Sequence, residues 1–358
     1  MTWRQSDDSK NRQNKNAGNG GDLVKHTVYL TVLNYLLARS PWSNELRVRE
    51  CHAGRGMYHI PSPDKRRPLL ECLYDPIGSD VGVLLHDVQR GLQSALGVWP
   101  ADTKAFEWYA GSALMNTWRL GRAGTGKHRH ELYEQDARIR ESLRDVLLNS
   151  GLSLPQVGVQ IFPKEEDGGK FDGEAHIETK VVNWSSQDLI LLDPFAMWRE
   201  KEDQPQRDRY RSILGRLIAL GQESPSLILF WTWGQNFPVA KGDLEGTNRP
   251  VRNGYQELRG LLHGAGRPFI RVAWRWELQF AMWVLVPEAH LNALRDALQH
   301  CCDDLRDHLL RHGCRKQDVE VAVDSGDCIR ESPSANRQSS IVNRKSLGGG
   351  QHGGNRQA

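Results

Sequence analysis

A run of apolar residues that ends on a carboxylate constrains the fold more than any other feature of this chain. Residues 189–192 are apolar at every position, and Asp193, Pro194 and Phe195 follow them. An unbroken apolar run predicts a parallel strand covered on both faces. In an open α/β sheet, the carboxyl ends of such strands line the ligand crevice. The segment is therefore either an active-site edge, where an acid and a ring hold a flat amine beside a cofactor, or an Asp-Pro turn that leaves a strand.

Strand and helix patterns alternate along most of the chain. The first helix is expected from Asp22, which would be its N-cap. Strands are expected at residues 46–51, 129–134, 157–162, 189–193 and 227–231, helices at 136–148 and 210–220, and a closing hairpin at 269–276 and 280–286. The order predicts an α/β fold, a doubly wound Rossmann-like sheet with an antiparallel C-terminal hairpin. Class I methyltransferases share that layout, but the fold alone leaves the function open.

The length allows one large domain with an insert or two modest domains, and the pattern along the chain predicts one main domain with polar ends. The chain has 358 residues, of which 39% are hydrophobic and 25% are charged, as in ordinary globular proteins. Residues 1–21 are polar and predict a flexible N-terminal arm, and residues 331–358 predict a disordered tail. The Rossmann-like domain would occupy residues 22–330, with a small, partly helical insert at about 61–106.

Charge and cysteine content bear on the partners of the protein and on the cellular compartment expected for it. The net charge is +3, which permits a polyanionic partner without requiring one. Six cysteines without CxxC pairs predict reduced thiols in a cytoplasmic protein and no metal site. The polar start and the lack of a long apolar run predict neither a signal peptide nor a membrane span. We expect no membrane association and favour a monomer.

A glycine turn follows the first expected strand. Gly54 and Gly56 stand in the sequence Ala-Gly-Arg-Gly, where the absence of Cβ atoms lets backbone approach a ligand. A dinucleotide fingerprint needs a further glycine three residues on, and that position is His59. The turn thus disfavours a nicotinamide cofactor and suits S-adenosyl-L-methionine, although many strand-to-helix turns use glycine structurally.

Acidic residues at later strand ends fit the same cofactor. Glu134 ends the second expected strand, where α/β nucleotide binders hold the ribose hydroxyls, although an acid that merely starts the next helix gives the same pattern. Asp172, followed by Gly173, lies between the third and fourth strands and is a candidate for the adenine amino group. Asp167 with Gly168 competes for that role.

Several segments, taken in order, resemble the RlmJ-type ribosomal RNA adenine-N6 methyltransferases. Residues 16–19 and 22–27 resemble the family's H-A-G-N…D-x-x-K-H-T, and residues 52–56 its T-H-A-G-x-G turn. Gly111-Ser112 resembles the start of G-S-P, and Asp193-Pro194 the start of D-P-P-Y. The resemblance covers residues from about 16 to 300. It implies N6-methylation of adenine in RNA, favoured over DNA, and a part in ribosomal RNA processing.

The resemblance implies a role for each matching residue. At the cofactor it implies Lys25 and His26 beside the pocket, His52 and Ser112 at the methionine end, Gly54 and Gly56 in the turn, Glu134 at the ribose, and Asp172 with Gly173 at the adenine. At the acceptor, Asp193 and the Pro194 carbonyl would bind the amine, and Phe195 or Trp198 would stack on a flipped base.

The chain departs from the family at the catalytic motif. D-P-P-Y is replaced by Asp193-Pro194-Phe195-Ala196, and this D-P-F resembles the three-Cys-motif partner proteins. Asn16 also replaces the first histidine of the arm motif. Two alternatives therefore stand beside the adenine methyltransferase: a methyltransferase with a different acceptor, and a catalytically decayed nucleic-acid-binding or partner protein on the same fold.

Overall fold

The computed structural model describes most of the residues that the sequence assigns to the sheet and its helices. It describes residues 18–60, 67–74, 83–100, 106–124, 127–149, 157–163, 188–193, 212–216, 226–232, 260–262, 268–275, 279–312 and 320–326, and isolated positions between them. The predictions for Asp172, Gly173, Pro194, Phe195 and Trp198 lie outside the described residues, as do those for most of the arm and for the tail.

The centre of the fold is a mixed eight-stranded sheet in the order β10-β8-β9-β7-β6-β1-β4-β5. Five neighbouring strands run parallel: β7 (Ser226–Thr232), β6 (Asp188–Leu192), β1 (Arg47–Glu50), β4 (His128–Tyr133) and β5 (Val157–Phe162). The sheet continues antiparallel through β9 (Gln279–Leu285), β8 (Phe269–Arg275) and β10 (Glu320–Gly326). Every residue of β6 is buried, as the apolar run predicted.

The strand order reverses at β1. From β1 the chain moves outward to β4 and then β5, and it returns to form β6 on the other side of β1. In open α/β sheets, such a reversal leaves a crevice outside the carboxyl ends of the two central strands. The residues that follow β1 and β6 therefore lie at the position where this topology binds ligands.

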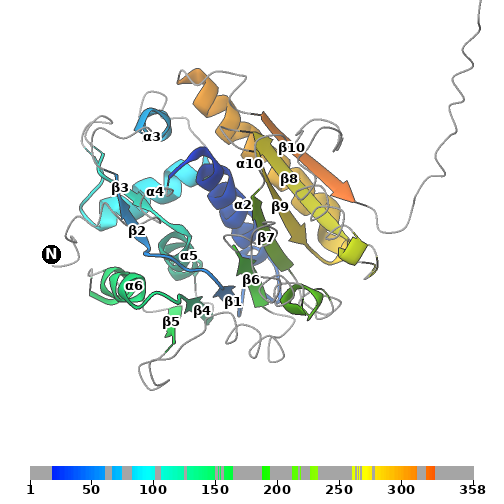
Figure 1. The fold of residues 1–358 in the computed structure, drawn as a ribbon, viewed down its shortest axis with the longest axis horizontal. Coiled ribbons are helices and arrows are strands. Elements are labelled where there is room, and N and C mark those ends of the chain that lie inside the picture. The colour runs from blue at the N-terminus through cyan, green and yellow to red at the C-terminus, as the bar shows by residue number, and fades with distance from the viewer. Residues whose placement is uncertain are drawn as a thin grey trace, which may run out of the picture. The chain divides into compact units, whose positions relative to one another are not determined.

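Helix α2 (Gly20–Leu37) is the central helix of the fold (Figure 1). It contacts β8 and three other helices: α4 (Leu84–Ala95), α5 (Ser112–Gly121) and α10 (Leu291–Arg311). Further helices in the described part of the chain are α3 (Arg67–Tyr74), α6 (Ala137–Asn149) and the 3₁₀ helix Glu288–His290, and residues 212–216 and 260–262 are also helical. None of the helices in the described part is long and apolar enough to cross a membrane.

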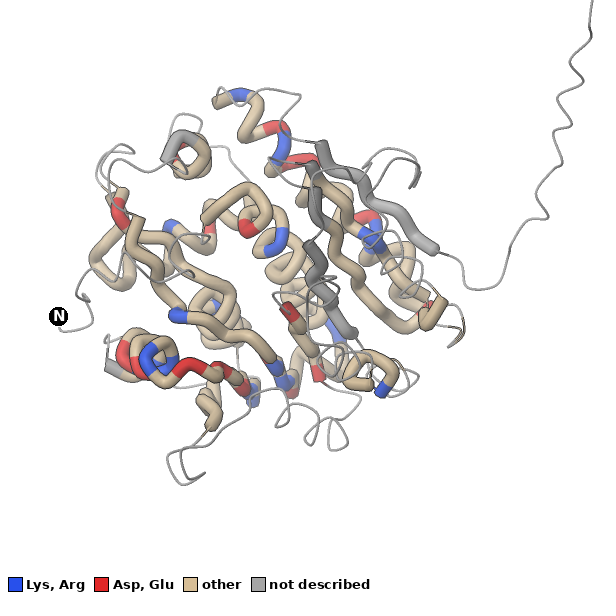
Figure 2. Tube along the Cα trace, in the orientation of Figure 1, with Lys and Arg blue, Asp and Glu red and all other residues tan. Residues whose placement is uncertain are grey.

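Helix α2 is apolar on nearly every side, which explains its central position. A helix that is hydrophobic all round is buried rather than amphipathic. Only two of its residues are charged, Asp22 and Lys25, and both lie in its first two turns (Figure 2). Both are largely shielded from solvent, so the sequence has buried two opposite charges at one end of an apolar helix.

The helix begins earlier than the sequence predicted. Asn19, rather than Asp22, is the N-cap, and its side-chain oxygen accepts a hydrogen bond from the Asp22 amide at 3.0 Å. The Asp22 carboxylate in turn accepts from the Gly18 amide at 2.8 Å. The two side chains thus each satisfy one backbone donor at the start of the helix, although Asp22 accepts from the residue before the N-cap and not from the N-cap itself as in a capping box. The prediction of Asp22 as N-cap was wrong because Asn19 supplies the cap and frees Asp22 for an ion pair.

The antiparallel part of the structure is larger than predicted. The expected hairpin is present as β8 and β9, but β10 adds a third antiparallel strand beyond β8. A separate two-stranded sheet, β2 (Met57–His59) with β3 (Trp108–Ala110), was also missed. Its strands have three residues each, which is too short for an alternating pattern to be recognised.

A buried ion-pair network crosses the central strands. Arg49 on β1 donates through Nε to Asp188 on β6 at 2.7 Å and pairs with Glu131 on β4. The Tyr133 hydroxyl donates to the same Glu131 carboxylate at 2.8 Å. Asp188 is fully buried and Arg49 is 5% exposed, so each charge depends on its partners for the hydrogen bonds that water would otherwise supply.

Replacing Asp188 is therefore expected to destabilise the protein strongly. Asp188→Ala removes a partner of Arg49 and should lower the free energy of unfolding by about 3 kcal/mol. The control is Asp296→Ala on α10, whose exposed carboxylate pairs with Arg295 and whose loss should change stability by less than about 0.5 kcal/mol. Urea unfolding followed by tryptophan fluorescence measures both. Equal effects of the two substitutions would contradict this interpretation of the network.

Candidate functional site

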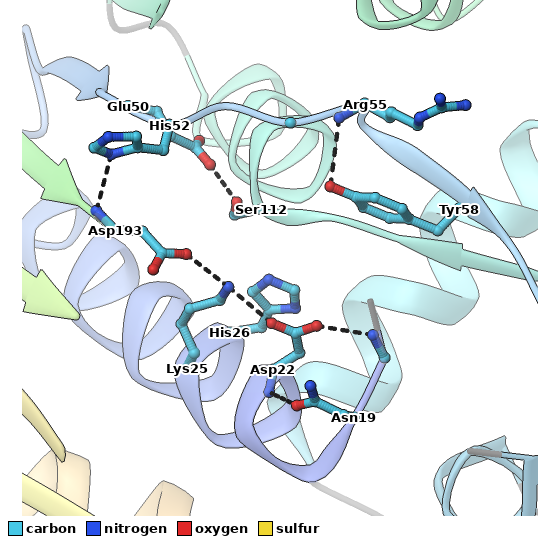
Figure 3. A network of polar contacts seen from close by, with 12 residues as sticks. Asn19, Asp22, Lys25, His26, Glu50, His52, Arg55, Tyr58, Ser112 and Asp193 are labelled. Atoms are coloured by element: carbon cyan, nitrogen blue, oxygen red, sulfur yellow. Dashed lines mark hydrogen bonds and ion pairs between the residues drawn. The ribbon is translucent and has the colours of Figure 1, made fainter. Parts of the chain in front are cut away.

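Lys25 joins α2 to the end of β6. Its ammonium Nζ lies 2.9 Å from Oδ2 of Asp193, the residue that follows β6, and 2.8 Å from Oδ1 of Asp22 on its own helix (Figure 3). The side chain of Lys25 is 11% exposed and that of Asp193 is 24% exposed. The motif resemblance implied a cofactor role for Lys25 and a catalytic role for Asp193, and the structure brings the two side chains into direct contact.

The charges of this cluster fix the protonation of Lys25 and Asp22. Burial alone would lower the pKa of Lys25, but Asp193 and Asp22 outweigh it and hold that pKa well above its usual value. Burial likewise opposes ionisation of Asp22, yet Lys25 and the hydrogen bond from Gly18 bring the Asp22 pKa below its ordinary value. Lys25 is therefore a permanent cation, and Asp22 a permanent anion, at neutral pH.

His26 faces a different neighbour from Lys25. Its Nδ1 lies 2.6 Å from the hydroxyl of Tyr109 on β3, and the two rings stack with centroids 5.6 Å apart. Burial, together with the charge of Lys25, lowers the pKa of His26 to about 3. The ring is therefore neutral at physiological pH, and it ties the short β2–β3 sheet to the first turns of α2.

His52 connects the two central strands at the reversal point. It follows β1, and its Nδ1 accepts a hydrogen bond from the backbone amide of Asp193 at 3.3 Å. The acceptor role of Nδ1 leaves the ring proton on Nε2 when the ring is neutral. This bond helps to hold the residue after β6 against the turn after β1, the position at which an open α/β sheet binds its ligand.

Glu134 fixes the glycine turn to the end of β4. Its Oε2 accepts from the Gly54 amide at 3.0 Å, and its Oε1 accepts from the Asp136 amide at 3.0 Å. Burial raises the pKa of Glu134, and the two amides oppose that rise only in part. Since each carboxylate oxygen has two lone pairs, each can still accept a hydroxyl hydrogen bond. Glu134 is thus held in place by the chain and keeps acceptor capacity for a ligand.

The two glycines of the turn adopt a left-handed backbone conformation. Gly54 has φ of 68° and Gly56 has φ of 81°, values that favour glycine over residues with a Cβ atom. A Cβ on Gly56 would also lie 2.9 Å from Leu143 Cδ1 on α6. At Gly56 the structure therefore requires glycine for the backbone conformation and for packing against α6. From the sequence, glycine was instead expected to let a ligand approach the backbone closely.

A second buried acid, Glu50, lies at the end of β1. Ser112 at the start of α5 donates to one of its carboxylate oxygens, and Asn116 donates to the other at 3.3 Å. His130 Nε2 lies 3.3 Å from the same oxygen as Asn116. The motif resemblance implied a cofactor role for Ser112. In the structure its hydroxyl donates a hydrogen bond to Glu50, which is 2% exposed.

The predicted site residues thus fall into two groups. Lys25, Asp193 and His52 form one hydrogen-bonded chain from α2 to the ends of β6 and β1, and Glu134 and Gly54 form another from β4 to the turn after β1. His26 and Ser112 lie beside the first group but bond to Tyr109 and Glu50 instead.

Sequence reasoning missed two acids of the site. Asp22 was assigned to the helix cap, and its spacing of three residues from Lys25 was the available signal for an ion pair on one helix face. Glu50 ends β1 as Asp193 follows β6, so the rule that sheets bind ligands at carboxyl ends would have found it. In the described part of the chain, no group of three or more His, Cys, Asp or Glu side chains could hold a metal ion.

Comparison with known proteins gives a fold and no family. No family model and no curated protein matches the chain. Its structure is similar to the crystal structure of protein LPL1258 from Legionella pneumophila, described as DUF519, with a TM-score of 0.56 and 14% sequence identity. The match covers 87% of this chain and 98% of that one. At this identity the likeness establishes a shared mixed α/β fold over most of both chains.

The neutral state of His26 predicts a pH dependence of stability. Its pKa of about 3 in the folded protein lies below the 6.5 of a free histidine, so the unfolded chain binds the proton more tightly. The stability that His26 contributes is complete above about pH 6.5 and is lost as the pH falls toward 3. His26→Gln should therefore flatten the loss of stability between about pH 6 and pH 4 by about one proton. Urea unfolding across this range measures the slope, and an unchanged slope would contradict the assignment.

Proposed function

We propose that this chain is an S-adenosylmethionine-dependent methyltransferase that acts on adenine N6 in a nucleic acid, with RNA favoured over DNA. The observation that carries the proposal is the position of Asp193. It follows a fully buried parallel strand at the reversal point of the sheet, and His52 and Lys25 hold it there from two other elements. The resemblance of the ordered motifs gives this acid the acceptor role.

The electrostatics of the site support a cationic cofactor. Asp22, Asp193 and Glu50 are acidic, whereas Lys25 is the one lysine or arginine that pairs with any of them among the described residues. With these acids ionised, the four side chains carry an excess of two negative charges. A ligand that carries a sulfonium and an ammonium group would be attracted to such a site, whereas the phosphate groups of a nucleotide would be repelled.

The chain offers separate contacts for the two ends of the cofactor. Glu134 would accept from the ribose hydroxyls, because two backbone amides already fix its carboxylate beside the glycine turn. Glu50 would hold the ammonium of the methionine end, oriented by Ser112 and Asn116. When bound, S-adenosylmethionine supplies an electrophilic methyl group on a positively charged sulfur.

Asp193 would activate the acceptor amine without first removing a proton from it. The lone pair of adenine N6 is delocalised into the ring, and acceptors that bind its N–H groups draw that pair toward the methyl. Lys25 uses Oδ2 of Asp193, and no residue in the described ranges donates to Oδ1. Oδ1 of Asp193 and the carbonyl of Pro194 would bind the two N–H groups. The amine, made acidic by the incoming methyl group, would then transfer its proton to the Asp193 carboxylate.

A nucleic-acid substrate is proposed on the resemblance and on charge. The chain has 47 Lys and Arg against 44 Asp and Glu, a small basic excess that is compatible with phosphate contacts. A ring at Phe195 or Trp198 would stack on the flipped base in place of the family's tyrosine. The alternatives remain another acceptor for the methyl group and a binding protein without transfer activity.

Asp193→Asn tests the proposed catalytic role. The substitution keeps the size of the side chain but weakens both the acceptor and the Lys25 pair, so methyl transfer should fall about 10²-fold or more. Affinity for S-adenosylhomocysteine, whose sulfur is uncharged, should stay within about threefold, because Glu134 and Glu50 are intact. Transfer of labelled methyl to separate RNA, DNA and protein pools measures the first, and calorimetry the second. Asp296→Asn on the exposed face of α10 is the control and should change neither.

The same assays separate the alternatives. Transfer to protein but to neither nucleic acid would favour a different acceptor. Absence of cofactor binding by the wild-type chain would favour the binding protein. Transfer that survives Asp193→Asn at the wild-type rate would contradict the catalytic assignment.

A further inference from the structure

Tyr29 has a buried hydroxyl that the fold itself does not use. The residue is 2% exposed, and its hydroxyl has no hydrogen-bond partner among the residues that the structure describes. A buried polar group without a partner destabilises a protein, and native structures rarely contain one without a reason. Phenylalanine would fill the same space on this apolar helix without that disadvantage.

The position of Tyr29 directs attention to the candidate site. It lies one helical turn after Lys25 on α2, a spacing that puts two side chains on the same helix face. Its ring is 6.4 Å from that of His26. Burial raises the pKa of the Tyr29 hydroxyl well above its usual value, and the next contribution comes from the charge of Asp193, with further ones from Lys25, Glu50 and Asp22. The hydroxyl is therefore protonated, and Lys25, one turn away on the same helix face, contacts Asp193 directly.

We propose that the Tyr29 hydroxyl, one helical turn from the contact between Lys25 and Asp193, binds the amino-acid end of S-adenosylmethionine. The inference rests on the proposed function and adds a residue outside the motifs that support it. A tyrosine hydroxyl can donate to the carboxylate and accept from the ammonium of that end. The ribose would lie at Glu134, which follows β4 on the other side of β1 from β6.

In this role the Tyr29 hydroxyl would increase ligand affinity and decrease the stability of the ligand-free protein. Its removal should therefore change affinity and stability in opposite directions. Removing the hydroxyl should weaken binding of ligands that carry the amino-acid end, and it should leave the free protein as stable as before or more stable. A merely structural tyrosine would show neither the loss of affinity nor this reversal of sign.

The test compares Tyr29→Phe with Tyr35→Phe on the same helix. Tyr35 is the matched control because its hydroxyl already has a partner, the Nδ1 of His290 at 3.1 Å. Calorimetry with the full chain would use two probes: S-adenosylhomocysteine, which has the amino-acid end, and 5′-methylthioadenosine, which lacks it. Thermal unfolding of the ligand-free proteins supplies the stability comparison.

Tyr29→Phe should weaken S-adenosylhomocysteine binding about tenfold, equivalent to about 1.4 kcal/mol, and leave methylthioadenosine binding unchanged. Its unfolding midpoint should equal or exceed that of the wild type. Tyr35→Phe should lower the midpoint and leave both affinities unchanged. Unchanged S-adenosylhomocysteine affinity in Tyr29→Phe, or an equal loss for both probes, would overturn the role of Tyr29 while the proposed function stands. Failure of the wild-type chain to bind either probe would overturn the proposed function and this inference with it.

Discussion

The ion pair between Lys25 and Asp193 is the interaction on which the arrangement of the site depends. Helix α2 is apolar on nearly every side, and hydrophobic packing alone is non-directional. A charge-assisted hydrogen bond is directional, and at 2.9 Å this one fixes the second turn of the helix to the residue after β6. Displacing the helix would leave a buried ammonium short of a partner, which is strongly unfavourable. The same contact therefore sets the register of the helix on the sheet and holds the candidate catalytic acid.

The charged side chains that stabilise the first turns of α2 are also those proposed to attract the cofactor. Asp22 and Asp193 together outweigh the burial of Lys25, and Glu50 adds a further buried acid with polar partners of its own. A formal excess of acidic over basic side chains in this cluster is what favours a cationic ligand in the proposed function. The proposed sulfonium cofactor would meet that condition, and the proposed role of Tyr29 would give a use to a hydroxyl that lacks a hydrogen-bond partner among the described residues.

The sequence predicted the sheet better than the contacts within the site. The apolar run before Asp193 identified β6 because a strand buried on both faces has no polar positions. The strand-end rule pointed to the ends of β1, β4 and β6, and the structure places those ends side by side in the sheet. The partners of those residues were harder to predict. The Lys25–Asp193 pair joins residues 168 apart in the chain, and the contact of His26 depends on β3, which is too short to leave a pattern. These long-range contacts depend on how α2 packs against the sheet, and the spacing of residues along the chain does not reveal that packing.

A crystal structure of the full chain with S-adenosylhomocysteine would show directly whether the cofactor binds where we propose. We expect the nucleoside at the carboxyl ends of β1, β4 and β6, with the ribose hydroxyls within hydrogen-bond distance of the Glu134 carboxylate and the sulfur facing Asp193. Density for the nucleoside at any other part of the protein, or a ribose that does not contact Glu134, would contradict this expectation.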